Sequence, residues 1–218
     1  LNENKNILTE KNNCIPVVNY VAAKNKKRKR IIKIKKNQWL KNYLDATKHK
    51  DVDLIVELIG GAEGPAKRLV FEALKNKKHV VTANKALIAK YGDELAKIAE
   101  KNKVNLEFEA AVCGGVPIVR SLKESLIANK ISKIYGIFNG TSNYILSSME
   151  KHNKSFNEVL SDAKKLGYAE ANPIADLNGD DVSAKLKILS SLCFNSFLNH
   201  KIYVEGIKDI DKEDIDNA

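Results

Sequence analysis

The chain has 218 residues, of which 44% are hydrophobic and 29% charged, and its formal net charge is +10. A chain of this length can bury a sizeable core in one large domain or two small ones. No apolar run approaches the roughly 20 residues that cross a bilayer, which argues against a membrane protein. The three cysteines form no CxxC pair and the four histidines are scattered, so we expect reduced thiols in a cytoplasmic protein without a structural zinc site.

The positive charge is concentrated in one segment. Between Lys24 and Lys50 there are twelve Lys or Arg residues and one acid, Asp45, whereas the rest of the chain is nearly neutral. A solvated loop is the favoured interpretation of this run, and contact of one or two of its side chains with a cofactor phosphate is the alternative. Nucleic-acid binding is disfavoured because aromatic residues for base stacking are nearly absent from the run.

The first half of the chain alternates between strand and helix patterns. A polar helix is predicted first, over residues 1–12. Strands are predicted at residues 14–23, 51–61, 79–86 and 104–112. Amphipathic helices are predicted at residues 37–49, 64–77 and 93–103. This order implies a parallel sheet covered on both faces, which right-handed crossovers make a doubly wound, Rossmann-like α/β sheet.

From about Ser121 the pattern changes, and it predicts a second, α+β domain. Helices are predicted at residues 122–130, 141–152, 156–168 and 181–194, with a strand at 131–140. The predicted division is therefore a doubly wound domain over residues 1–120 and an α+β domain over residues 121–218.

A dinucleotide-binding sheet normally opens with a strand and a glycine-rich turn, yet no GxGxxG occurs in this chain. The chain starts at Leu1 in an apparent helix and ends in the charged stretch KDIDKEDIDNA. We therefore expect a sheet that lacks its first strand, in a chain truncated at both ends and inactive by itself.

Two lysines carry the predicted chemistry. Lys185 lies three residues after Val182 and four before Leu189, on or beside the apolar stripe of its helix, with Asp181 one turn earlier to hold its ammonium. A lysine whose stem covers apolar surface is the alternative. Lys85 follows the strand at 79–86, at the edge of the sheet where ligands of open α/β sheets bind, although an ordinary loop lysine has the same pattern.

Two loops offer further polar groups. The segment GYAEANP, residues 167–173, presents Tyr168 and Glu170, which can orient an ammonium or hydroxyl, although helix capping and a turn explain it equally. The segment EAAVCGGVP, residues 109–117, lets backbone carbonyls converge on a hard cation, and it also suits a tight domain crossover.

Six segments now combine into one pattern. They are DVDLIVELIGG, KHVVTANKALIA, EFEAAVCGGVPIV, GIFNGTSNYIL, LGYAEANP and DLNGDDVSAKLKIL. Their order and spacing resemble those of the homoserine dehydrogenases, closely over about residues 50–195 and loosely over residues 1–50. The resemblance implies reduction of L-aspartate 4-semialdehyde to L-homoserine with NADH or NADPH, on the route to threonine, isoleucine and methionine.

The resemblance also implies roles for particular positions. The proton-transferring lysine falls on Lys185, with Lys85 and Asp181 beside the reacting centre. Substrate-binding positions fall on Gly140, Thr141, Tyr168, Glu170, Asp176 and Asp181. Cofactor positions fall on Gly60, Gly61 and Lys85, and Lys24 joins them because it follows the strand predicted at 14–23, where a basic residue favours the 2′-phosphate of NADP. A monovalent cation, usually sodium in this family, falls on Glu109, Val112, Gly114 and Val116.

The sequence departs from the family at two points. The glycine-rich phosphate loop has no counterpart, and Asn172 replaces the Asp usual before Pro173. The partners implied are a small-molecule substrate and a second copy of the chain in a homodimer, with no membrane. An inactive fragment or a basic nucleic-acid-binding module is the rival interpretation.

Overall fold

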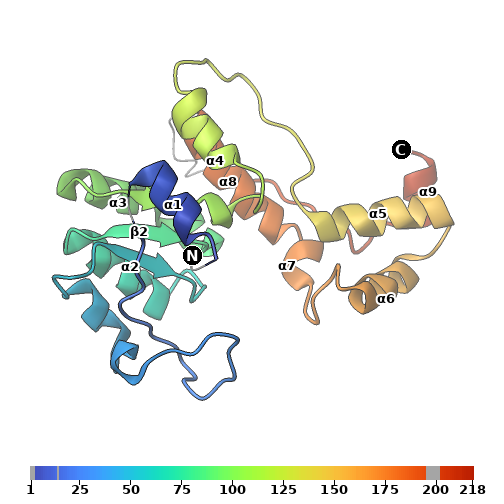
Figure 1. Ribbon diagram of the computed structural model, residues 1–218. Coiled ribbons are helices and arrows are strands. Elements are labelled where there is room, and N and C mark those ends of the chain that lie inside the picture. The colour runs from blue at the N-terminus through green and yellow to red at the C-terminus, as the bar shows by residue number, and fades with distance from the viewer. Residues whose placement is uncertain (1–2, 14, 195–201) are drawn as a thin grey trace.

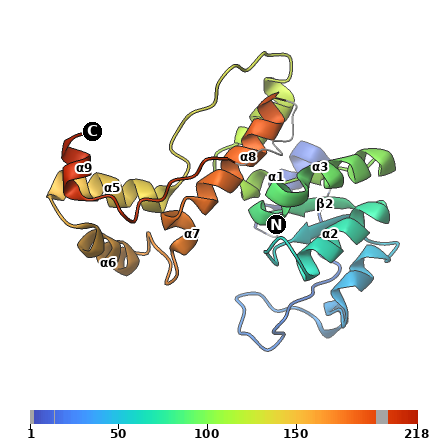
Figure 2. The ribbon, with the colours of Figure 1, turned by 180° about the vertical axis from the view of Figure 1, so that it is seen from behind.

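The structure is a computed structural model that describes residues 3–13, 15–194 and 202–218. Figures 1 and 2 show two lobes, one built around a small β-sheet and one built from helices, with the long helix α8 (Asp180–Phe194) running from the helical lobe to the sheet lobe. Helix α8 packs against both α7 (Ile174–Leu177) and α3 (Lys85–Asn102), so it connects the two lobes physically.

The sheet is parallel, with its three strands in the order in which they occur along the chain. These are β1 (Leu54–Glu57), β2 (His79–Thr82) and β3 (Leu106–Glu107). Helix α2 (Pro65–Lys75) connects β1 to β2, and α3 connects β2 to β3. The α/β class with a parallel sheet is thereby confirmed, and these strands and helices lie within or overlap the segments predicted for them.

One face of the sheet packs against α2 and α3. Ile55, Val80 and Leu106 point into this core, where they meet the apolar stripes of the two helices. The buried residues of α2 include Leu69, Val70, Ala73 and Leu74, which form its apolar stripe. Leu54 and Val56, which alternate with the buried positions of β1, are exposed.

The segment before the sheet differs from its prediction. Residues 14–23 form no strand: Cys14 lies outside the described residues, and the rest contributes only an isolated bridge between Val21 and Trp39. Local apolar character predicted a buried strand, but Val17 and Val18 are exposed and Pro16 has no amide hydrogen to donate. The helix predicted at 37–49 is replaced by two short 3₁₀ helices, η1 (Lys36–Gln38) and η2 (Tyr43–Thr47), because Trp39 is extended and pairs with Val21. Ahead of this segment, α1 (Lys5–Asn12) forms as predicted.

After β3 the described residues contain helices and no strand. A short 3₁₀ helix, η3 (Glu109–Ala111), precedes α4 (Ile118–Arg120), which continues into a π-helical turn, η4 (Ser121–Ser125). Helices α5 (Gly140–His152), α6 (Phe156–Leu166), α7 and α9 (Lys212–Asp216) form the helical lobe. The strand predicted at 131–140 was wrong: Tyr135 and Ile137 are exposed, and no strand among the described residues lies beside the segment to supply the ladder that a strand needs.

The helical lobe has its own small core, which Ile145, Met149, Val159, Ala163, Ala169 and Leu177 form. Helix α6 begins at a capping box made by Ser155 and Glu158, and it ends where Gly167 takes the left-handed conformation (φ 80°). None of the described helices is long and apolar enough to cross a membrane.

Candidate active site

A pocket of about 420 Å³ opens where the carboxyl ends of β1 and β2 meet α8. Small residues form most of its wall, and two lysines and one carboxylate supply its charge. The lining comprises Gly60, Ala83, Asn84, Lys85, Ala86, Ala110, Ala111, Cys113, Gly114, Asp181 and Lys185. Ligands of open α/β sheets bind at this edge, so the pocket lies where the strand order predicted a site.

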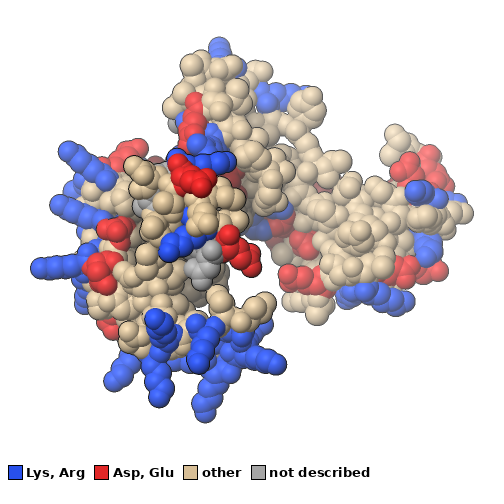
Figure 3. Space-filling model, in the orientation of Figure 1, with Lys and Arg blue, Asp and Glu red and all other residues tan. Residues whose placement is uncertain are grey.

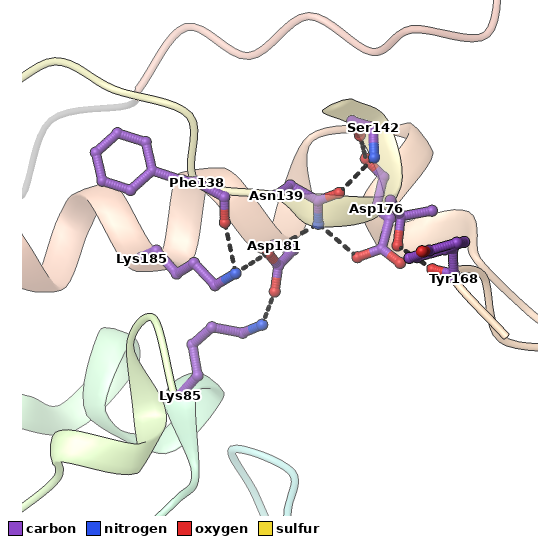
Figure 4. A network of polar contacts seen from close by, with 9 residues as sticks. Lys85, Phe138, Asn139, Ser142, Tyr168, Asp176, Asp181 and Lys185 are labelled. Carbon is purple, nitrogen blue, oxygen red and sulfur yellow. Dashed lines mark hydrogen bonds and ion pairs between the residues drawn. The ribbon is translucent and has the colours of Figure 1, made fainter. Parts of the chain in front are cut away.

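Lys85 and Lys185 share one carboxylate in this pocket. Lys85 is the first residue of α3 and donates to Oδ1 of Asp181, while the Nζ of Lys185 lies 2.6 Å from Oδ2 of the same residue. Figure 4 shows the two ammonium groups approaching Asp181 from different elements. Because Asp181 and Lys185 are one turn apart on α8, the helix itself sets their pairing.

The cluster is partly buried, and burial changes its acid–base chemistry. The side chains of Asp181, Lys185 and Lys85 are 10%, 17% and 30% exposed. Burial, followed by repulsion from the Lys185 ammonium, lowers the pKa of Lys85 below its ordinary value, and attraction by Asp176 opposes this shift. A group of two ammonium ions around one carboxylate therefore offers net positive charge to whatever occupies the pocket.

Asn139 organises the other side of this cluster. Its side-chain amide donates to Oδ1 of Asp176 at 2.8 Å and to Oδ2 of Asp181 at 3.0 Å, and its side-chain oxygen accepts from the backbone N–H of Ser142 at 2.7 Å, which caps α5. The carbonyl of the preceding residue, Phe138, accepts from Lys185 at 2.7 Å. The start of α5 therefore fixes the acids of α7 and α8 and one N–H of Lys185 (Figure 4).

The remaining predicted substrate positions lie around the starts of α5 and α7. Gly140 is the first residue of α5, next to Asn139, and the hydroxyl of Thr141 donates to the carbonyl of Tyr168 at 2.8 Å. The ring of Tyr168 stacks on that of Tyr144, and Tyr168 as a residue is 57% exposed. Glu170 is also exposed, and the described residues give its carboxylate no hydrogen-bond or ion-pair partner.

Of the predicted cofactor positions, Gly60 and Lys85 line the pocket, whereas Gly61 and Lys24 are not among its lining residues. The carbonyl of Gly61 accepts from the side chain of Asn84 at 2.7 Å. Lys24 is exposed at the start of the basic loop. In that loop the Arg30 guanidinium donates to three backbone carbonyls, those of Asn25, Lys26 and Arg28. Figure 3 shows many Lys and Arg side chains projecting outward on the part of the molecule where Figure 1 draws this loop.

The predicted cation positions lie in the turn after β3, and their strongest ligand is already engaged. The two carboxylate oxygens of Glu109 accept from the backbone N–H groups of Val119 and Arg120, at 3.0 and 2.8 Å. Neither the Val112 nor the Gly114 carbonyl accepts a hydrogen bond from a described residue. The described residues contain no group of three or more His, Cys, Asp or Glu side chains able to hold a metal ion.

Neither Asn139 nor the carbonyl of Phe138 was predicted to belong to the site. An asparagine followed by Gly-Thr-Ser ahead of an apolar helix is a recognisable N-cap signal. That signal predicts the start of α5, but it does not predict that the same amide reaches Asp181, 42 positions further along the chain.

Comparison with known proteins relates both lobes to one family. The family model described as the NAD binding domain of homoserine dehydrogenase matches residues 5–109, and the model described as homoserine dehydrogenase matches residues 117–218. The homoserine dehydrogenase of Neisseria gonorrhoeae is 48% identical over 181 residues, which are 83% of this chain and 41% of that protein.

Solved structures give the same result. A crystal structure of S. aureus homoserine dehydrogenase matches with a TM-score of 0.82 at 37% identity, covering 99% of this chain and 52% of that chain. A hyperthermophilic archaeal homoserine dehydrogenase in complex with NADPH matches with a TM-score of 0.71 at 29% identity, covering 78% of this chain and 52% of that chain. This chain thus spans about half or less of the length of these relatives. Since its sheet lobe and its helical lobe both match the same enzyme, the chain belongs to the homoserine dehydrogenase family.

Proposed function

We propose that the full-length protein is a homoserine dehydrogenase, which interconverts L-aspartate 4-semialdehyde and L-homoserine with a nicotinamide cofactor. The observation that carries the proposal is the pair of lysines sharing Asp181 in a pocket at the carboxyl ends of β1 and β2. The family of the chain and its NAD-binding model support the same reaction.

Lys185 is suited to move the proton in this reaction. A nicotinamide, when bound, supplies or accepts the hydride. As the aldehyde is reduced, its oxygen gains negative charge, and an ammonium in a partly buried pocket both stabilises that charge and supplies a proton. Asp181 and the Phe138 carbonyl take two of the three N–H groups of Lys185, which leaves the third for a substrate oxygen.

Lys85 supports this step from the opposite side of Asp181. Its own ammonium neutralises the second carboxylate oxygen, so that Asp181 does not cancel the charge of Lys185 completely. The pKa of Lys85 is lowered by burial and by Lys185, so it loses its proton at a lower pH than an ordinary lysine. In the direction of reduction we therefore expect activity to fall on the alkaline side as Lys85 loses its charge.

The end of the amino-acid substrate that carries its ammonium group, remote from the reacting carbon, would meet the helical lobe. We assign Gly140, Thr141, Tyr168, Glu170 and Asp176 to this end of the substrate. The acidic side chains suit its ammonium group, and the hydroxyl groups suit its polar atoms. Supporting this, Asp176 joins the lysine cluster through Asn139, and Thr141 is bonded to the Tyr168 loop.

The pocket fits a nicotinamide cofactor in two respects. The part of its wall that follows β1 and β2 includes Gly60, Ala83 and Ala86, whose small size lets a flat ring approach the backbone. The ammonium groups of Lys85 and Lys185 line the same pocket. We assign Gly60, Gly61 and Lys85 to the cofactor. NADP is the preferred form in this proposal because the archaeal relative was solved with NADPH and because Lys24 and its neighbours are basic without a nearby acid. The described residues of 14–23 do not form the strand from which the position of Lys24 was predicted, so the basic character of the segment is what remains of that argument.

A direct assay tests the reaction. The full-length protein should reduce NADP when given L-homoserine and oxidise NADPH when given L-aspartate 4-semialdehyde, both followed by absorbance of the reduced cofactor. An absence of turnover with both substrates, in protein that melts cooperatively, would refute the proposal. Charge reversal of Lys24, with the specificity constants for NADPH and NADH measured separately, tests the cofactor preference, and an unchanged ratio would show that the basic run is only a solvated loop.

A monovalent cation such as sodium is a further element of the proposal. Because the Glu109 carboxylate holds the start of α4, the residues fit a cation only through main-chain oxygens of the turn. The carbonyls of Val112 and Gly114 accept no hydrogen bond from a described residue, whereas that of Val116 already accepts from the N–H of Ile118 at 2.8 Å. Replacing sodium by a bulky organic cation at constant ionic strength should then lower activity, and equal rates in both salts would contradict this assignment.

The wider biological setting rests on the same reaction. We propose a cytoplasmic homodimer that serves threonine, isoleucine and methionine biosynthesis, with residues 1–120 as the cofactor domain and residues 121–218 as the catalytic domain. Analytical ultracentrifugation of the full-length protein would detect the dimer, and sedimentation as a monomer at assay concentrations would overturn that part of the proposal.

A further inference from the structure

A buried carboxylate lies beneath the pocket and takes no part in the chemistry described above. Glu57, the last residue of β1, has no exposed surface at all. Among the described residues no lysine, arginine or histidine pairs with it, although burying a charge without a partner is expensive. Three hydrogen-bond donors hold the carboxylate in place of a cation.

Two of these donors belong to the loop that lines the pocket. The backbone N–H groups of Ile59 and Gly60 donate to Oε1 of Glu57 at 2.6 and 3.0 Å. Gly60 has a positive φ of 84°, as does Gly61 with 81°, so this loop turns sharply directly after the strand. The carboxylate therefore fixes the path of the chain at the point where it passes the pocket.

The third donor connects Glu57 to the neighbouring strand. The hydroxyl of Thr82, also without exposed surface, donates to Oε2 of Glu57 at 2.5 Å and accepts from the backbone N–H of Asn84 at 3.0 Å. The side chain of Asn84 then donates to the Gly61 carbonyl at 2.7 Å and accepts from Leu87 at the start of α3. The network is thus a closed ring that joins both loops of the pocket and the helix that begins with Lys85.

We infer that Glu57 and Thr82 are positioning residues that set cofactor affinity without touching the cofactor. This inference rests on the proposed function, because it takes the loop at Gly60 to contact the nicotinamide cofactor. The ring holds the Gly60–Gly61 loop and the start of α3 at one fixed separation, so that binding energy is not consumed in ordering two mobile loops. Loss of this hydrogen-bonded ring leaves the residues that line the pocket unchanged but no longer fixes the distance between the Gly60–Gly61 loop and the start of α3.

The decisive variant is Thr82→Val, which keeps the shape of the side chain and removes the hydroxyl. We expect the Kd and the KM for NADPH to rise about tenfold, the factor for one or two lost hydrogen bonds, with a much smaller change in kcat at saturating cofactor. Thr82→Ser, which restores a hydroxyl, should restore the affinity. Glu57→Gln should also weaken NADPH binding, because an amide has a single acceptor oxygen and cannot accept both from Thr82 and from the N–H groups of Ile59 and Gly60.

The chain offers a matched control in Thr47. It is likewise buried, at 1% exposure, and its hydroxyl donates to the carbonyl of Leu44 at 2.8 Å, but it does not line the pocket. Thr47→Val should cost stability without changing NADPH affinity. Thermal melts separate the two effects, and fluorescence titration with NADPH measures binding even in a protein that turns over no homoserine.

Two results would overturn the inference. One is an NADPH affinity in Thr82→Val that stays within about twofold of that in Thr47→Val. The other is an equal loss of affinity in Thr82→Val and Thr82→Ser, since the hydroxyl would then not be the cause. If Thr82→Val fails to fold, Glu57→Gln decides alone, and unchanged NADPH binding there refutes the inference. A wild-type protein that binds NADPH but does not oxidise homoserine refutes the proposed function and not this one.

Discussion

Two clusters in this chain have the same composition, two lysines around one carboxylate, but differ in their exposure. In the pocket the shared carboxylate is Asp181, whose side chain is 10% exposed. On the surface two lysines from α2 and α3 share Glu63, whose side chain is 55% exposed. Water screens the surface cluster, so its ion pairs contribute little, whereas the same charges interact strongly where water is largely excluded. The number of ion pairs is therefore a poor guide to function, and burial next to a pocket is a better one.

The comparison predicts its largest effect at Lys185. Lys185→Met in the full-length protein should keep the fold, because methionine preserves the length and apolar stem of lysine on the helix. It should lower kcat and kcat/KM together by roughly 10²–10⁴-fold, the range for loss of a general acid. Steady-state kinetics with homoserine and NADP, together with a thermal melt, measure both.

Lys187 provides the control for this experiment. It lies two residues further along α8, about 200° around the helix, and forms no ion pair with any described residue. Lys187→Met should change rates by less than about twofold, as expected of a charge outside the cluster. Similar, small effects at the two positions would contradict the assignment of Lys185 as the proton donor.

A smaller effect is expected at Asn139, an uncharged residue that holds the carboxylates of Asp176 and Asp181 by hydrogen bonds. Serine caps a helix about as well as asparagine, so Asn139→Ser preserves the start of α5 but removes the amide that donates to Asp176 and Asp181. Loss of hydrogen bonds to charged groups should lower kcat roughly 10–100-fold while the KM for the nicotinamide cofactor stays nearly constant.

The same substitution at another helix cap isolates this effect. Asn42 caps η2 by accepting from the N–H of Leu44 at 3.1 Å, and it contacts neither acid of the site. Asn42→Ser should leave kcat unchanged. If Asn139→Ser turns over at the wild-type rate, the side-chain amide of Asn139 has no role in the reaction and the residue serves only to cap α5.

The difference between Lys185 and Asn139 explains how much of the site could be predicted from the sequence. Lys185 was recognisable because the period of one helix places it beside an apolar stripe with Asp181 one turn away. Asn139 and Glu57 were not, because the hydrogen bonds that give them their place in the site reach other elements, from Asn139 to Asp181 42 positions away and from Glu57 to Thr82 25 positions away. Residues that act through long-range hydrogen bonds leave no periodic signal in the sequence.

The fold shows the same limit. The three strands of the sheet were predictable because each apolar run is bounded by helices with clear amphipathic stripes. The apolar runs at 14–23 and 131–140 have similar composition, yet the described residues of neither form a strand. A strand requires a partner in space as well as a pattern, and the pattern alone does not reveal whether a partner is present.

The smallest effect is expected in the surface cluster, at Glu63. Hydrogen bonds from Lys90 and then Tyr91 lower the pKa of Glu63 from 4.5 to about 2. A carboxyl group whose pKa is lower in the folded state contributes stability above its unfolded value, and this contribution is lost as the pH falls through the folded value. Glu63→Gln should therefore lower the melting temperature slightly at neutral pH, and the difference in melting temperature from wild type should shrink as the pH falls from 4.5 towards about 2.

Glu100→Gln on α3, where the carboxylate has no ion pair among the described residues, should show no such trend. Because Glu63 lies outside the pocket lining, kcat should stay within about twofold of wild type. A larger loss of activity in Glu63→Gln would show that an exposed cluster can be as important to the proposed activity as the buried one, and it would remove the distinction between the two.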